Sequence, residues 1–451
     1  MKSITSSLFA KTRAGRRTRR LILAIWSTGS TKAVSMFLSV AQVPIAIHAF
    51  GEEGFGLWVT LTATVALLSF ADFGITNGMQ NRIAGAFARN DEYQINRVFW
   101  TATIVLAGVG ALVFLISWMV VPFFNWASLF HVNTPALRSQ TSFALVLLVI
   151  GFAMGLPLST IPRLLAGIQQ GWLQGIINLT ISIWTIVAIL FCARLKLDFL
   201  FFIGLIAIAT PLVHLASYLW MHRVFPFVRP QRSMFSLMEL RSLAHLGWQF
   251  LIPQIGASVL AFAPQLIVSN SLGAAAVTPF NLCQRVVGVL QQIQTIALTP
   301  VWPAYSEAHQ SGDIKWIRMA FGISLGGSVA IFALAALGFS QFGSALIEFW
   351  TGSSSELPSP ALINWFSAWL FLTGIGVPMA YLLNGLSRLK GVLVYGSLNM
   401  VATVVAMPIA AKYFGASGVV MSMCLSYLVI VLPANSVDVC LALAKNSPFK
   451  K

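Results

Sequence analysis

The sequence predicts an all-α integral membrane protein whose roughly twelve transmembrane helices form two pseudo-symmetric lobes of six helices. Three observations lead to this prediction. Of the 451 residues, 57% are hydrophobic and 9% are charged, whereas soluble domains carry roughly 25% charged residues. The apolar residues fall into stretches of about 20, the length that crosses a bilayer as a helix. A glycine turn also recurs at matching positions in the two halves of the chain.

The expected spans follow one another with short connections. They comprise residues 26–49, 55–80, 98–121, 141–162, 173–193, 199–221, 248–270, 277–303, 317–339, 361–384, 390–411 and 416–440. The longest outer loops are expected near 122–140 and 340–360. The longest inner segment, 222–247, is interpreted as a linker. It divides an N-terminal lobe, 1–235, from a C-terminal lobe, 236–451.

The repeated turn supports this division. A short motif with glycine in second place joins the first two spans, the seventh and eighth, and the last two, as Phe50-Gly51, Leu272-Gly273 and Phe414-Gly415. Glycine permits tight turns, so one match would mean little. The first two matches occupy the same position in successive six-helix halves, and parallel repeats of six helices are a transporter architecture.

The charge distribution predicts the orientation. The net charge is +16, and 22 of the 28 Lys and Arg residues fall on one predicted side, including a basic N-terminus. Cytoplasmic loops collect Lys and Arg, so both termini are expected in the cytoplasm. A basic soluble protein would suggest nucleic acid as a partner, but the sequence shows no nucleic-acid-binding motif.

The cysteines and histidines indicate no metal or cofactor. Four cysteines lie in apolar stretches without a C-x-x-C pair, and six histidines are scattered without metal-binding spacing. We therefore expect neither a cofactor nor a catalytic residue.

Polar residues form stripes along four of the predicted spans. Their helical spacing places them on one face of the first, second, seventh and eighth spans. The stripes include Ser35, Ser39 and Gln42; Ser69, Asp72 and Thr76; Gln254, Ser258 and Gln265; and Asn281, Arg285 and Gln292. Polar groups are costly against lipid, so the stripes face either neighbouring helices or a water-filled cavity. Their pairing between the two halves favours a cavity.

Lys32 and Asp72 are expected at one depth on adjacent spans. Each lies 17 residues from the outer end of its span, or about 25 Å at 1.5 Å per residue. An ion pair is the economical interpretation, because a single charge in the bilayer costs roughly 3 kcal/mol. The pair could latch two helices together or act as a charge switch in a cavity.

Arg285 is the strongest candidate for substrate binding. It lies about 12 Å from the outer surface, and no acidic residue at matching depth is near it in the sequence. Its guanidinium could bind an anion such as a phosphate, or it could bond to backbone carbonyls. The full set of candidate cavity residues is Arg285, Asn281, Gln292, Gln254, Gln265, Lys32, Asp72 and Gln42.

Two sequence blocks resemble the polysaccharide transporter family, which includes the O-antigen flippases. The first begins at Phe50-Gly51-Glu52-Glu53-Gly54-Phe55-Gly56-Leu57-Trp58 and continues with Ala71-Asp72-Phe73-Gly74-Ile75. The second comprises Phe280-Asn281-Leu282-Cys283-Gln284-Arg285 and Leu298-Thr299-Pro300-Val301-Trp302-Pro303. The resemblance implies the multidrug/oligosaccharidyl-lipid/polysaccharide (MOP) flippase fold, with a cavity lined by the first, second, seventh and eighth helices.

The resemblance also implies a function. Such proteins move undecaprenyl-pyrophosphate-linked oligosaccharides across the bacterial inner membrane by alternating access, for O-antigen, capsule or exopolysaccharide synthesis. Their partners would be membrane lipid and the polymerase or glycosyltransferases of the pathway. One alternative is a cation-coupled multidrug antiporter of the same fold, which would place acidic residues in the cavity; here Asp72 is the one deep acid in the stripes. A membrane-embedded polymerase or ligase would need larger outer loops.

Overall fold

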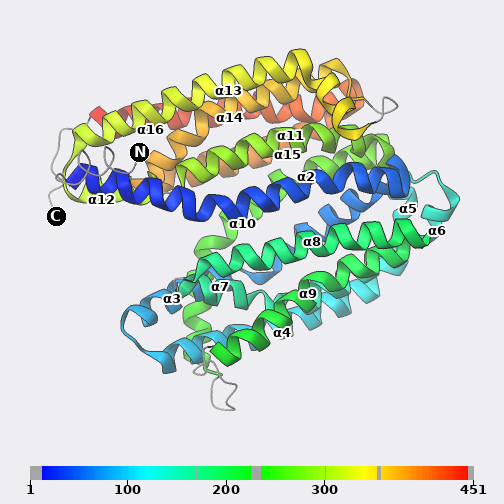
Figure 1. Cartoon of the computed structure of the whole chain (residues 1–451), viewed down its shortest axis with the longest axis horizontal. Coiled ribbons are helices and arrows are strands. Elements are labelled where there is room, and N and C mark those ends of the chain that lie inside the picture. Colours follow the sequence, from blue (N-terminus) through cyan, green and yellow to red (C-terminus); the bar gives the residue numbers. More distant parts are fainter. Residues whose placement is uncertain are drawn as a thin grey trace, which may run out of the picture. The chain divides into compact units, whose positions relative to one another are not determined.

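The computed structural model describes residues 13–168, 170–224, 235–299, 301–352, 357–386 and 388–444. These ranges are helical almost throughout and contain no strand (Figure 1). Nine helical stretches within them are long and apolar enough to cross a membrane. The all-α membrane fold predicted from the sequence is therefore confirmed.

The nine stretches are consistent with about twelve spans. Two of them contain a glycine break: the stretch Phe37–Asp72 breaks at Gly51, and the stretch Leu393–Ala444 breaks at Gly415. Each of these two therefore holds parts of two predicted spans. The remaining predicted span corresponds to helix α11, Ala274–Leu298, which has the length to cross a bilayer but is more polar.

All three glycines of the repeated turn have a positive φ. The values are 70° at Gly51, 94° at Gly273 and 59° at Gly415. This left-handed region is open to glycine and costly for other residues. The repeated motif therefore marks sharp turns between successive spans; their position outside the membrane remains a prediction.

The chain divides into two compact units, which are described separately. The first unit contains residues 34–281, and the second contains residues 282–451 together with the start of the chain. These borders lie within helices α2 and α11. They differ from the predicted lobes 1–235 and 236–451, which remain a prediction.

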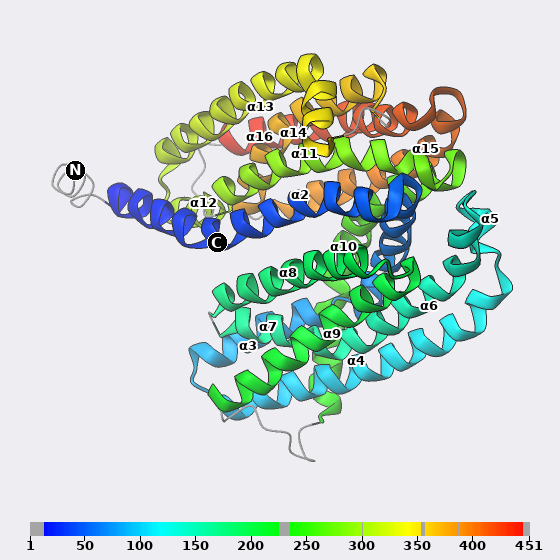
Figure 2. The ribbon, with the colours of Figure 1, turned by 45° about the vertical axis from the view of Figure 1, so that its right-hand side comes forward.

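The first unit is built from the second part of α2 and the helices that follow it. Its elements are α2 (Arg13–Leu67), η1 (Leu68–Asp72), α3 (Ile75–Ala88), α4 (Glu92–Val120), η2 (Val121–Phe123), α5 (Trp126–Leu129), α6 (Pro135–Leu158), α7 (Thr160–Gly167), α8 (Gly171–Leu195), α9 (Phe199–Val224), α10 (Leu237–Leu272) and the first turns of α11. Helices α4, α6 and α9 pack side by side (Figure 2). Helix α10 packs against α3, α4 and η1.

The second unit contains the rest of α11 and the last helices. These are α12 (Val301–Gln310), α13 (Ile314–Thr351), α14 (Pro360–Gly385), α15 (Leu389–Ser426), the π-helical turn η3 (Tyr427–Val431) and α16 (Leu432–Ala444). Helices α13 and α14 run side by side in both views (Figures 1 and 2). Helix α13 continues to Thr351, where Gly352 ends it with a φ of 69°. The predicted outer loop at 340–360 is therefore largely helical, because no proline occurs in it before that glycine.

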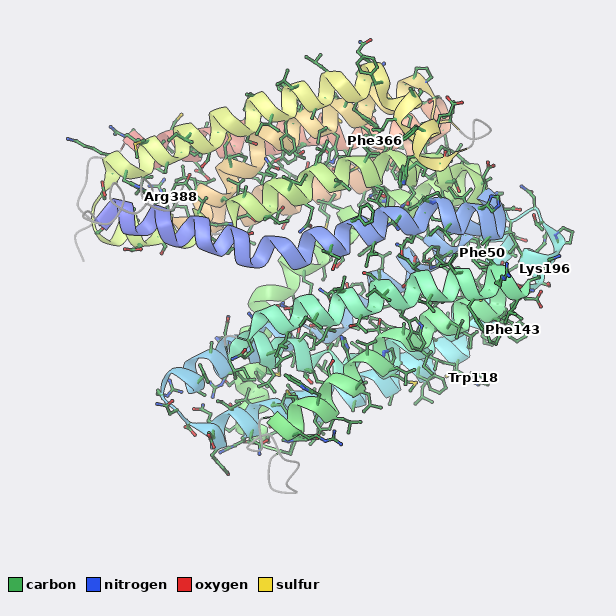
Figure 3. The ribbon with its side chains drawn as sticks, viewed as in Figure 1. Phe50, Trp118, Phe143, Lys196, Phe366 and Arg388 are labelled. Carbon is green, nitrogen blue, oxygen red and sulfur yellow. The ribbon has the colours of Figure 1, made fainter. Side chains whose placement is uncertain are left out.

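The outside of the helices is apolar, as a lipid environment requires. Large hydrophobic side chains are exposed along most of the spans. Trp118 on α4 and Phe143 on α6 are 63% and 67% exposed and project from the first unit (Figure 3). Soluble proteins rarely expose apolar surface on this scale, so this surface is suited to hydrocarbon.

Candidate functional site

The second predicted span breaks in its middle, at Asp72. The chain passes from α2 into the short 3-10 helix η1, and Phe73 and Gly74 then take left-handed conformations, with φ of 50° and 71°. Asp72 organises the restart of the helix. One carboxylate oxygen accepts a hydrogen bond from the Gly74 amide at 2.8 Å, and the other accepts from the Thr76 hydroxyl at 2.5 Å. A side chain that bonds the backbone two residues on is typical of an aspartate turn.

Gln254 on α10 completes the bonding of Asp72. Its side-chain amide donates to an Asp72 carboxylate oxygen at 2.8 Å and to the Ser69 carbonyl at 2.9 Å. Its own oxygen accepts from Asn77 at 3.3 Å. One turn further along, the hydroxyls of Ser69 and Ser258 lie 2.9 Å apart. The predicted polar stripes of the second and seventh spans therefore bond directly to each other.

Two glycines allow these helices to approach closely. A Cβ atom at Gly74 would lie 2.3 Å from the carbonyl oxygen of Gly247, and a Cβ atom at Gly247 would lie 2.6 Å from the carbonyl oxygen of Phe73. Both distances are far below van der Waals contact. The backbones at the start of α3 and in α10 therefore cross at a point where neither Gly74 nor Gly247 can be replaced by a residue with a side chain.

The same antiparallel contact continues to the predicted outer end of the unit. A Cβ atom at Gly56 would lie 2.0 Å from the carbonyl oxygen of Ala274, so the backbones also meet there. The Thr278 hydroxyl donates to the Glu52 carbonyl at 2.7 Å. The second predicted span therefore packs against α10 and the start of α11 along their length.

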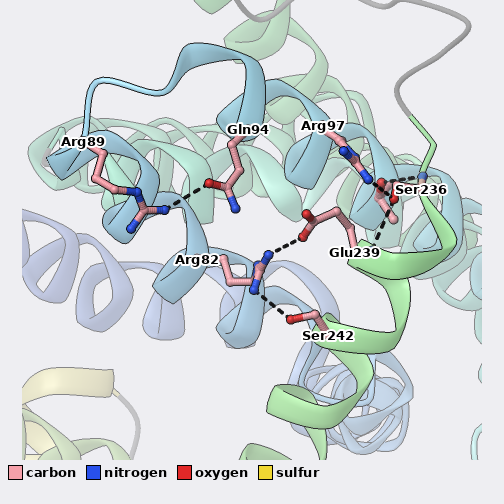
Figure 4. Close-up of polar contacts among 8 residues, drawn as sticks. Arg82, Arg89, Gln94, Arg97, Ser236, Glu239 and Ser242 are labelled. Carbon is pink, nitrogen blue, oxygen red and sulfur yellow. Dashed lines mark hydrogen bonds and ion pairs between the residues drawn. The ribbon is translucent and has the colours of Figure 1, made fainter.

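An ion pair closes the opposite end of this contact. The Arg82 guanidinium donates to the Glu239 carboxylate at 2.7 Å and to the Ser242 hydroxyl at 2.8 Å (Figure 4). Glu239 is 3% exposed and Arg82 is 27% exposed. Arg97 on α4 donates to the Ser236 hydroxyl, which also accepts from the Glu239 amide at the start of α10. The start of α10 is therefore anchored to α3 and α4.

The other candidate residues are distributed along α2, α10 and α11. Gln42 is 9% exposed, Gln265 8% and Asn281 5%. Gln292 and Arg285 are half-buried, and Arg285 interacts with other groups of the protein. The side chain of Lys32 lies outside the described residues. Of the eight predicted residues, the structure shows a direct contact between Asp72 and Gln254.

Sequence reasoning missed two groups. Arg82 was counted only among the 22 Lys and Arg residues on one predicted side. Its partner Glu239 lies in the predicted linker 222–247 and was not considered. His214 was set aside because it belongs to no metal motif, yet it is 8% exposed within α9. An ionisable residue inside a span is itself a functional signal. Within the described ranges, no three His, Cys, Asp or Glu residues are grouped to hold a metal ion.

Comparison with known proteins places this geometry in a family. The family described as "Polysaccharide biosynthesis protein" matches residues 24–309. A Yersinia pseudotuberculosis protein named for O-antigen export is 22% identical over 330 residues, covering 69% of this chain and 73% of that protein. A Salmonella typhi protein named as an O-antigen transporter is 22% identical over 331 residues, covering 72% and 74%.

A solved structure shares the fold. A multidrug resistance transporter of the MATE family and MOP superfamily, in an inward-facing conformation, superposes with a TM-score of 0.75 at 16% identity. The match covers 92% of this chain and 96% of that one. The chain therefore belongs to the polysaccharide biosynthesis protein family, and it is a multi-pass membrane transporter with the MOP superfamily fold.

Proposed function

We propose that this protein is a flippase for a lipid-linked oligosaccharide. Its substrate would be an undecaprenyl-pyrophosphate-linked glycan, moved across the bacterial inner membrane for the synthesis of O-antigen, capsule or exopolysaccharide. The observation that carries the proposal is the family match over most of the chain, supported by two relatives named for O-antigen export or transport. Both termini would lie in the cytoplasm, in agreement with the positive charge of the predicted inner segments.

Arg285 is the residue proposed to bind the pyrophosphate. It is half-buried on α11 and belongs to the same helix face as Asn281 and Gln292. A guanidinium offers a planar fork of donors that matches phosphate oxygens. The neighbouring amides could bond to phosphate or to sugar hydroxyl groups. This face therefore suits an anionic, hydroxyl-rich substrate better than an apolar one.

Alternating access would require the contact between the second and seventh predicted spans to change. That contact consists of a backbone crossing at Gly74 and Gly247, with hydrogen bonds on either side. Polar contacts of this kind are worth about 0.6 kcal/mol each in membranes, so they can be broken and remade at modest cost. The arrangement supports a contact that opens during transport.

The bonding of Asp72 gives no support to the alternative of a drug antiporter that uses this residue as its coupling carboxylate. A coupling carboxylate must be able to exchange its ligand during transport. The Asp72 carboxylate accepts hydrogen bonds from Gly74, Thr76 and Gln254. These bonds give Asp72 a structural role in the conformation described here. The likeness to a MATE transporter at 16% identity concerns the fold alone.

A deletion strain tests the proposed function. Loss of the gene should cause undecaprenyl-linked oligosaccharide to accumulate inside the cell while surface polysaccharide is lost. Complementation with the intact chain should reverse both effects. The proposal would be refuted if the deletion strain exported normal polysaccharide, or if it lost polysaccharide without accumulating the lipid-linked intermediate, since a polymerase or ligase defect acts after translocation.

A further inference from the structure

The first unit contains a partly open pocket whose lining includes none of the eight predicted cavity residues. Its volume is about 330 Å³, and its walls come from α2, α6 and α9. Most of the lining is apolar. The polar groups that line it are Thr62, Ser159, Thr210 and His214. None of these four belongs to the predicted cavity residues.

His214 is the distinctive group of this pocket. It lies within the apolar span of α9 and is 8% exposed. Its ring nitrogen Nδ1 is buried and has no hydrogen-bond partner within the described structure. Buried polar atoms in proteins are nearly always bonded. An unbonded imidazole nitrogen inside a membrane span therefore makes this pocket a candidate binding site.

Among the described residues, no other titratable group lines the pocket. The lining residues of α2, α6 and α9 other than His214 are apolar or carry a hydroxyl group. Helices α7 and α8 also pack against α9, but their titratable residues Arg163, Cys192 and Arg194 are absent from the lining. Of the described residues that line the pocket, His214 is thus the one that can gain a charge near neutral pH.

Two of the three hydroxyl groups that line the pocket donate their protons to backbone carbonyls. Thr62 donates its proton to the Trp58 carbonyl at 2.8 Å, and Ser159 donates to the Leu156 carbonyl at 2.6 Å. Each hydroxyl oxygen keeps lone pairs for a further bond. Acceptors of this kind suit a donor or a cation. A charged imidazole could be buried here if its N–H groups bonded to such acceptors directly or through water.

We propose that this pocket binds the coupling proton of the transport cycle, with His214 as the base. The Nδ1 lone pair takes a proton from hydronium, leaving water, and returns it to water when the pocket faces the other compartment. An alkali ion would prefer a set of oxygen ligands over an imidazole nitrogen. The proposal rests on the chain being a transporter and does not depend on which glycan it carries.

Gly155 provides a way to close the pocket while His214 is kept. It lines the pocket, and a Cβ atom added to it would meet no other atom within 4 Å. Gly155→Leu should therefore fill the space without a backbone clash. Gly108→Leu on α4 is the matched control, since Gly108 also has open space around it but is exposed on the outside. His245→Gln is the control for His214→Gln, because His245 is exposed.

The test combines a titration with an export assay. The full-length protein, labelled with ¹³C and ¹⁵N in histidine, is placed in lipid nanodiscs and titrated by NMR, with His214→Gln used to assign the signal. We expect the His214 ring to change protonation state within about pH 5 to 8, and this titration to be lost in Gly155→Leu. In cells, His214→Gln and Gly155→Leu should lose most polysaccharide export at normal membrane abundance, while both controls export normally.

Each other outcome overturns the proposal. A His214 ring that keeps one protonation state over this range excludes proton binding. A titration that persists unchanged in Gly155→Leu excludes the pocket as the site. Normal export by His214→Gln excludes coupling, even if the ring titrates. A signal that responds to sodium chloride and not to pH would assign the pocket to an alkali ion. The titration needs no substrate, so its result is independent of the proposed glycan.

Discussion

The side-chain amide of Gln254 donates a hydrogen bond of 2.8 Å to the carboxylate of Asp72. This bond joins the stripes of the second and seventh predicted spans, which the sequence assigned to different halves of the chain. The Asp72 carboxylate also accepts from the Gly74 amide and the Thr76 hydroxyl. One buried aspartate thus restarts a broken helix and holds a second helix against it.

The first prediction concerns this double role. Asp72→Leu should destabilise the protein by about 1–3 kcal/mol for each buried donor left without an acceptor. Asp72→Asn should cost much less, since its carbonyl oxygen can still accept from Gly74 and Gln254. The measurement is the thermal unfolding midpoint of purified protein in detergent. Gln254→Leu combined with Asp72→Leu should recover part of the loss, because the two residues are in contact.

The same variants distinguish this role from the predicted ion pair with Lys32. If an ion pair dominated, removal of the charge would matter most, so Asp72→Asn would be as damaging as Asp72→Leu. Lys32→Met would then restore Asp72→Asn. Equal unfolding midpoints for the two Asp72 variants would therefore contradict the hydrogen-bond account and favour the ion pair.

The second prediction concerns the backbone crossing. Gly247→Ala should force α3 and α10 apart, because the new Cβ atom would lie 2.6 Å from the Phe73 carbonyl oxygen. Overpacking of this kind typically costs about 1–3 kcal/mol. Gly108→Ala is the control, since that position has open space. Membrane abundance and the unfolding midpoint should fall for Gly247→Ala alone; equal values for both variants would show that the crossing tolerates separation.

The sequence was sufficient to predict the fold because a bilayer imposes simple rules. Span length, the asymmetry of Lys and Arg and the turns at Gly51, Gly273 and Gly415 are all local patterns. The polar faces of the second and seventh spans were also readable from their spacing. Their direct bonding was not, since helical periodicity gives the direction of a face and not the neighbour opposite it.

The ion pair of Arg82 and Glu239 could not be predicted from the sequence either. Both residues fall in segments predicted to be inner connections, where charges normally face water. The pair became visible only once α10 was found to begin at Leu237 and to pack along α3. His214 was a different omission, since a lone histidine within an apolar span already called for an explanation.

The third prediction concerns that ion pair. Arg82→Ala leaves the Glu239 carboxylate, which is 3% exposed, without its cation. Breaking a buried pair costs up to about 3–5 kcal/mol, and the cost should lie at the lower end because Arg82 is partly exposed. The double variant Arg82→Ala with Glu239→Gln should be more stable than Arg82→Ala alone. Arg89→Ala, which removes an exposed arginine bonded to Gln94, should leave the unfolding midpoint almost unchanged.

The fourth prediction concerns topology. A single cysteine is introduced at Asp198 or at Glu92, both of which are exposed, in a background where the exposed Cys440 is replaced by Ser. A membrane-impermeant thiol reagent applied to intact cells should label Asp198→Cys. It should label Glu92→Cys only after the inner membrane is opened. The reverse pattern would place the termini outside the cytoplasm and contradict the charge asymmetry.

The last prediction concerns Arg285, the residue proposed to bind the substrate's pyrophosphate. Arg285→Ala should abolish polysaccharide export, because no other basic side chain belongs to this face of α11 in the sequence. Arg285→Lys keeps the charge but loses the bidentate fork, so it should retain part of the export. Arg194→Ala, at an exposed position at the end of α8, is the control and should export normally. Surface polysaccharide is measured beside the abundance of each variant in the membrane fraction.

Abundance separates binding from a structural role, since Arg285 also interacts within the protein. Substrate binding requires that Arg285→Ala remain in the membrane at normal levels while export stops and lipid-linked oligosaccharide accumulates. Disappearance of the protein would assign Arg285 to folding, because the groups that interact with its guanidinium would then be left unbonded. Normal export by Arg285→Ala would exclude it from the transport path. Partial export by Arg285→Lys at normal abundance would show that the charge itself contributes, as expected for an anionic group that binds and leaves in each cycle.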